Sequence, residues 1–137
     1  MNFNLSIGLE GEAQELVTQE NTAKKYGSGG IEVYATPAMV GLMENACLKA
    51  VDPQLPEGFA TVGIHLDIKH LAATPIGMNV RAKAILREID GKKLTFSVQA
   101  YDEKEMIGKG NHTRYIIQVD KFLQRSASKA ENQVNDD

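Results

Sequence analysis

Three segments between residues 59 and 101 place apolar side chains at every second position. They cover residues 59–71, 78–89 and 93–101. A period of two is typical of a β-strand that buries one face. The Asp90-Gly91 dipeptide between the last two segments favours a two-residue hairpin, so these segments should pair as antiparallel neighbours. The sequence therefore predicts an antiparallel sheet with one apolar face.

The strand expected at 59–71 contains two histidines and a glycine whose directions matter for the site. Strict alternation from residue 60 onward puts one set of side chains toward the core: Val62, Ile64, Leu66 and Ile68. His70 has the same parity, so its ring should also face inward, whereas His65 should face outward. Gly63 interrupts this aliphatic strand, and a glycine there often marks a bulge or a close backbone approach.

A sheet with one apolar face must be covered by another layer. Residues 36–51 read TPAMVGLMENACLKAV and predict a helix. Thr36 is suited to cap its start, Pro37 fits the first turn, and Asp52-Pro53 ends it. With further strands expected at 12–18 and 106–119, the sequence predicts an α+β fold in which one long helix is wrapped by a five-stranded antiparallel sheet.

The length of 137 residues fits a single domain, which we place at residues 1–125. The polar segment 126–137, SASKAENQVNDD, has little to bury and is expected to be disordered. Fifteen basic against eighteen acidic residues give a net charge of −3 without a basic cluster, so we expect no nucleic-acid and no membrane partner. The start of the chain lacks the pattern of a signal peptide, and the single cysteine, Cys47, suits a reducing compartment. A cytoplasmic protein is expected.

Glu44 is the least expected residue of the predicted helix, because it lies at the border of the apolar face. One interpretation is a surface glutamate whose stem reaches water. The other is a partly desolvated carboxylate that acts as a base or nucleophile. His70 allows a similar pair of interpretations, as a packed histidine at a strand end or as a catalytic group directed at the same layer as Glu44.

Three further residues complete the candidates. Thr36 is explained by helix capping alone, yet its hydroxyl lies at the start of the helix that carries Glu44. A backbone N–H at Gly63 could donate to an oxyanion. Arg114 could pair with a phosphate or carboxylate, although a solvated arginine is the common case, and His112 is expected to face outward or lie at an edge. The three scattered histidines have no metal-ligand spacing, so no metal is expected.

With these residues in view, the chain resembles the hotdog-fold thioesterases, most closely the fluoroacetyl-CoA thioesterase family. The similarity runs from about Leu9 to Phe122. Its densest parts are TPAMVGLMENAC, the TVG of residues 61–63, KHLAATPIGM, DGKKLTFSVQAYD and IGKGNHTRYII. Several motifs in matching order are more specific than any one of them.

The resemblance implies a hotdog fold that pairs as a homodimer with active sites at the interface. It implies hydrolysis of an acyl-CoA thioester with no metal and no organic cofactor. The matching catalytic positions are Thr36, Glu44 and His70, and the matching substrate-binding positions are Gly63 and Arg114.

Members selective for the fluoroacetyl group carry phenylalanines in a lid before the catalytic threonine, where this chain has GSGG at residues 27–30. The acyl group therefore stays open, as does the choice between Glu44 as nucleophile and as general base. Two other interpretations remain at this point. One is a non-catalytic hotdog protein that binds acyl-CoA, and the other is a purely structural dimer.

Overall fold

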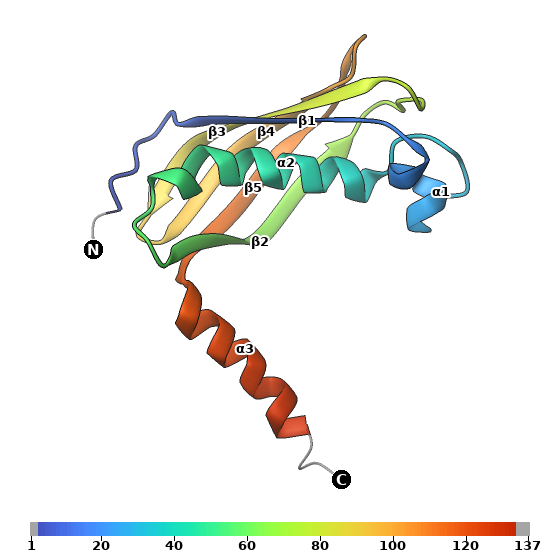
Figure 1. Ribbon diagram of the computed structural model, residues 1–137. Coiled ribbons are helices and arrows are strands. Elements are labelled where there is room, and N and C mark those ends of the chain that lie inside the picture. Colours follow the sequence, from blue (N-terminus) through green and yellow to red (C-terminus); the bar gives the residue numbers. More distant parts are fainter. Residues whose placement is uncertain (1–2, 134–137) are drawn as a thin grey trace.

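The computed structural model describes residues 3–133 and has one sheet around one long helix (Figure 1). The sheet order is β1-β3-β4-β5-β2, and every neighbouring pair is antiparallel. The strands are β1 (Glu10–Leu16), β2 (Phe59–His70), β3 (Asn79–Asp90), β4 (Lys93–Tyr101) and β5 (Met106–Gln118). The long helix α2 (Thr36–Val51) lies along the inner face of the sheet. This confirms the predicted α+β arrangement.

The core forms between α2 and the central strands. The helix buries Met39, Met43 and Cys47 completely, and the facing strands bury Leu86 and Phe96. The alternating residues expected to face inward on β4, together with most of those on β3, are fully or almost fully buried. Gly108 on β5 permits this packing, because a Cβ there would lie 2.5 Å from the Met39 sulfur. A period-two pattern thus located the core correctly on these strands.

Strand β2 departs from strict alternation. Its register with β5 shifts between Gly63 and His65, so Ile64 is the extra residue of a β-bulge. Before the bulge Thr61 faces the core beside Ile116, and Ile64 is 53% exposed. The prediction that Val62 and Ile64 face inward is therefore wrong, because one inserted residue exchanges the two faces. Beyond the bulge the predicted parity holds.

Two segments between and after these elements are more regular than expected. The stretch predicted as a loop after β1 contains a 3-10 turn, η1 (Gln19–Asn21), and a short helix, α1 (Ala23–Tyr26), which ends at Gly27 in the left-handed region with φ 76°. A second 3-10 turn, η2 (Asp52–Gln54), follows α2.

The predicted disordered tail is the larger difference. Residues 126–133 belong to α3 (Val119–Gln133), which extends away from the sheet (Figure 1), and residues 134–137 lie outside the described residues. The segment is rich in good helix formers, and helical hydrogen bonds need no core. The scarcity of apolar residues was thus a poor guide to local order. Within residues 3–133, no helix has the length and apolar character needed to cross a membrane.

Candidate active site

Thr36 does not cap the helix that it begins. The N-cap residue is Ala35, which makes no side-chain capping bond, and Pro37 occupies the first turn as predicted. The Thr36 hydroxyl lies instead 2.7 Å from His70 Nδ1, at the end of β2. The prediction that Thr36 caps the helix is therefore wrong, because its hydroxyl contacts a histidine instead.

His70 is held through only one of its two ring nitrogens. Nε2 is buried and, within the described part of the chain, has no hydrogen-bond partner. Burial lowers the pKa of the ring below its usual 6.5, so the imidazole is neutral at pH 7. A neutral imidazole with one nitrogen fixed and the other unpartnered is suited to exchange a proton.

A second group forms around Glu44, two turns further along α2. A Cβ built on Gly63 would lie 2.9 Å from Glu44 Oε2 and 2.9 Å from His112 Cε1. The carboxylate thus occupies space that only a glycine leaves free. The Glu44 side chain is 38% exposed. The side chain is therefore neither fully solvated nor buried. This exposure is intermediate between the surface glutamate and the desolvated carboxylate that the sequence allowed.

His112 was expected at an edge or facing outward, and this prediction is wrong because the residue is fully buried. Its Nδ1 lies 2.8 Å from the His65 carbonyl oxygen, so Nδ1 must carry a proton and donate it. Its Nε2 lies 3.1 Å from Nη1 of Arg114, which can only donate, so Nε2 must accept. Both contacts require the neutral ring, and burial likewise lowers its pKa. The 4.0 Å approach to Glu44 is therefore not an ion pair.

Arg114 extends this network toward the end of the helix. It is 6% exposed and donates from Nε to the Thr61 hydroxyl at 2.8 Å and from Nη2 to the Thr61 carbonyl at 2.9 Å. The Thr61 hydroxyl in turn donates to Asp52 at 2.6 Å. Arg114 is thus a buried, hydrogen-bonded cation and not the solvated arginine that is common on strands. Arg114 Nη1 and Glu44 Oε2 both approach the same nitrogen of His112, Nε2, at 3.1 Å and 4.0 Å.

The structure places the candidate residues in two separate pairs within one chain. Thr36 contacts His70, whereas Glu44 lies beside Gly63. Eight helical residues separate Thr36 from Glu44, about 12 Å along the axis, and no ion pair joins Glu44 to His70 among the described residues. Thr61, Asp52 and His112 were missed from the sequence. The even parity that His112 shares with the apolar Ile116 was the available signal for its inward direction.

Among residues 3–133 no group of three or more metal-ligating side chains is placed to hold an ion. The expectation of a site without metal or cofactor stays a prediction. What the two pairs offer is acid–base chemistry: a carboxylate at a glycine gap, a neutral histidine held by a hydroxyl, and a buried cation nearby.

Comparison with known proteins gives concordant results. A family model described as fluoroacetyl-CoA-specific thioesterase matches residues 17–120. A fluoroacetyl-CoA thioesterase of Streptantibioticus cattleyicolor is 44% identical over 91 residues, which cover 66% of this chain and 66% of that relative, just under two thirds. All five candidate residues predicted from the sequence fall within the range of the family model.

Solved structures agree with the fold. A structure of a fluoroacetyl-CoA thioesterase has a TM-score of 0.85 and 34% identity, covering 92% of this chain and 98% of that chain. A Thermus thermophilus protein described as a thioesterase superfamily member has a TM-score of 0.83 and 32% identity, covering 93% and 96%. A hot-dog-like protein of Thermanaerovibrio acidaminovorans, 23% identical with a TM-score of 0.84 over 94% and 97%, shares the fold. The predicted hotdog fold is confirmed.

Proposed function

The chain belongs to the fluoroacetyl-CoA-specific thioesterase family, and from this premise we propose that it hydrolyses a short-chain acyl-CoA thioester to the free acid and CoA. The observation that carries the proposal is the Glu44 carboxylate held at the gap left by Gly63. A carboxylate that water can reach, next to a strand bulge, can meet a small acyl group. The predicted alternative of a non-catalytic binder has no observation in its favour.

Glu44 carries out the central step. Either its carboxylate adds to the thioester carbonyl, or it removes a proton from the water that adds. The carbon–sulfur bond then breaks, and the departing thiolate finally takes up the proton that the water gives up. In the first route water afterwards cleaves the acyl-enzyme anhydride, so both routes yield one acid and one thiol. The backbone N–H groups at the Gly63 bulge would stabilise the developing oxyanion, for which one donor is typically worth about 3 kcal/mol.

His70 moves the proton in this scheme. If its Nδ1–H donates to the Thr36 hydroxyl, Nε2 keeps a free lone pair, so it can first accept a proton from water or from protonated Glu44 and then deliver that proton to the thiolate. Thr36 thereby holds the ring in place. Arg114 has a supporting role, because its buried charge and its donation to His112 favour a negative charge near Gly63 without requiring direct contact with substrate.

Completion of the site requires a second copy of the chain, and we include a homodimer in the proposal. Strand β2 is an edge strand of 12 residues with Ile64 and Leu66 53% and 45% exposed. An antiparallel pairing of two β2 strands about a twofold axis at residue 67 would place His70 opposite Gly63 of the partner subunit, since both lie three paired positions from residue 67 once the bulged Ile64 is left out of the count. The two pairs would then face each other across the interface.

Complementation tests both parts. Glu44→Ala and His70→Ala should each lower kcat/KM for acetyl-CoA at least ~100-fold while the fold survives. Mixed and reassembled, the two inactive variants should regain about one quarter of wild-type activity, because half of the dimers are mixed and each of these has one intact site of two. Mixtures that stay inactive although mixed dimers form would mean that each site lies within one chain. Unchanged single variants would reject the catalytic roles.

Thiol release across a panel of acyl-CoAs that includes fluoroacetyl-CoA defines the acyl group. The glycines at residues 27–30 stand where selective members have phenylalanines, so acetyl-CoA and propionyl-CoA should be hydrolysed at rates comparable with fluoroacetyl-CoA. We also infer a cytoplasmic location, because a CoA thioester is an intracellular metabolite and the free, buried Cys47 suits a reducing compartment.

A further inference from the structure

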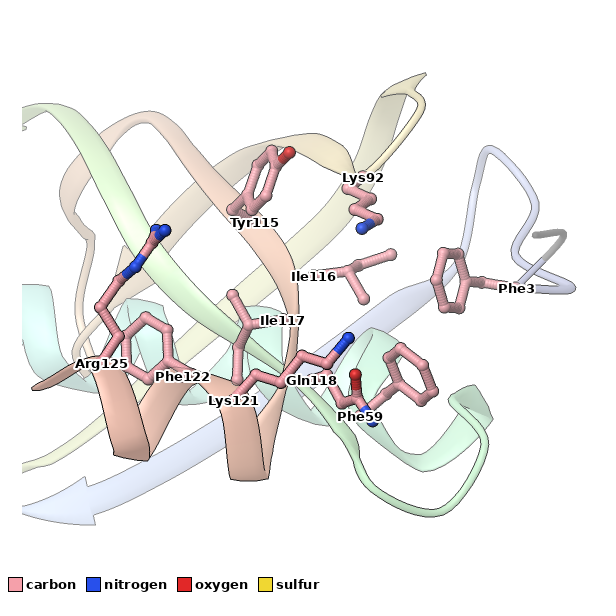
Figure 2. A pocket seen from close by; sticks show the side chains of 10 residues that line it. All are labelled: Phe3, Phe59, Lys92, Tyr115, Ile116, Ile117, Gln118, Lys121, Phe122 and Arg125. Carbon is pink, nitrogen blue, oxygen red and sulfur yellow. The ribbon is translucent and has the colours of Figure 1, made fainter.

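A cavity of about 520 Å³ lies at the opposite end of β2 and β5 from the Thr36–His70 pair (Figure 2). It is formed where β5 continues into α3, beside the Gly91-Lys92 hairpin loop. This volume falls within the range of about 300–1,000 Å³ that is usual for small-molecule sites. None of the residues assigned above to catalysis lines it.

The lining combines aromatic rings with positive charge. Four rings line it, those of Phe3, Phe59, Tyr115 and Phe122. Figure 2 shows Phe122 and Arg125 together on α3 next to the strand that carries Tyr115. Lys92 and Lys121 add two further cations to Arg125, and no acidic side chain lines the cavity.

These cations have no protein counterion. Among residues 3–133 the ion pairs are confined to other side chains, so Lys92, Lys121 and Arg125 form none. Three unpaired cations within one small cavity repel one another unless an anion joins them. Arginine and lysine are the usual phosphate-binding side chains, and purine bases stack on aromatic rings and on guanidinium planes. The chemistry therefore fits a ligand with both an aromatic base and several phosphate charges.

We propose that this cavity, the Lys121–Arg125 pocket, binds the 3′-phosphorylated ADP half of the CoA substrate. This rests on the proposed function, because it assigns a position to the far end of the same substrate. Four strand residues separate Arg114, at the reacting end, from Gln118, at the pocket, about 13 Å at the usual rise per residue. The pantetheine arm is a flexible chain that can bridge such a distance. The adenine would lie among the rings, and the phosphates would meet the three cations.

The test compares substrates that differ only at the nucleotide end. In Lys121→Ala/Arg125→Ala, KM for acetyl-CoA should rise about tenfold or more at low ionic strength with kcat unchanged, since the lost contacts bind ground and transition state alike. For S-acetylpantetheine, which lacks the nucleotide, the same variant should match wild type within about twofold. Lys104→Ala removes an exposed charge at the other end of β5 and should leave both substrates unaffected.

Adenosine 3′,5′-bisphosphate provides a second, non-catalytic readout. Calorimetry should detect its binding to wild type and to Lys104→Ala, and a loss of at least tenfold in affinity in the double variant. Equal changes in KM for both substrates, no change at all, or undiminished nucleotide binding would overturn the pocket assignment while leaving hydrolysis intact. If no thioester of either kind were hydrolysed, the proposed function would fail. The calorimetric measurement of nucleotide binding would then test the pocket assignment by itself.

Discussion

Gly63→Ala isolates the geometry on which the site depends. The added Cβ would lie 2.9 Å from Glu44 Oε2 and from His112 Cε1. Nonbonded heavy atoms make contact at roughly 3.5 Å, so each distance is short by about 0.6 Å. His112 is fixed by the His65 carbonyl and by Arg114, whereas the Glu44 carboxylate is the end of a flexible, partly exposed side chain. Glu44 will therefore be the group that moves.

The expected result is a large loss of activity with little loss of stability. Displacing a reacting group by about 1 Å can cost 10²-fold, so kcat/KM for acetyl-CoA should fall by roughly 10- to 100-fold. Since the carboxylate can swing toward water, the free energy of unfolding should fall by less than the ~1–3 kcal/mol typical of overpacked cores. Steady-state thiol release and urea denaturation measure the two quantities separately.

Gly41→Ala is the matched control, because it makes the same chemical change on α2 where a Cβ meets nothing within 4 Å. It should leave kcat/KM unchanged and raise stability by up to about 1 kcal/mol, the usual gain of alanine over glycine in a helix. Full activity in Gly63→Ala would refute the reasoning. Glu44→Asp shortens the side chain that carries the carboxylate. If combining it with Gly63→Ala partly restored activity, this result would support the reasoning.

Three further outcomes follow from the hydrogen bonds. Thr36→Val should lower kcat at least about tenfold by releasing the His70 ring, with little change in melting temperature because Ala35 is the N-cap, whereas Thr36→Ser should stay active. Arg114→Met should lower the free energy of unfolding by at least about 2 kcal/mol in urea titrations, since it leaves buried polar groups unpaired, and Lys109→Met on the exposed face of β5 should not. Stability should fall as the pH drops below 6.5, because burial lowers the pKa of His70 and His112 so that the unfolded chain binds more protons there. Urea midpoints at pH 7.5 and 5.0 should show this fall, and His112→Gln should reduce it.

The sequence alone determined the layers of this protein. Alternation in β3 and β4 and the start and end signals of α2 are local properties, so they predict a helix on an antiparallel sheet without knowledge of any contact. The resemblance in the motifs around Thr36, Glu44 and His70 directed attention to one helix and one strand. Their catalytic roles stay predictions.

Tertiary structure decided which side chains meet. The bulge at Ile64 exchanges the faces of β2, and a parity argument cannot detect one inserted residue. The hydrogen-bonded network of Asp52, Thr61, Arg114 and His112 joins three segments that are distant along the chain, so no local spacing in the sequence indicates it. Whether Thr36 caps its helix or holds His70 depends on where β2 ends. The sequence by itself determined which faces of the strands and of the helix are apolar, because periodicity sets burial. Only the tertiary structure decided which polar groups meet on those faces, because their hydrogen bonds join residues that are distant along the chain.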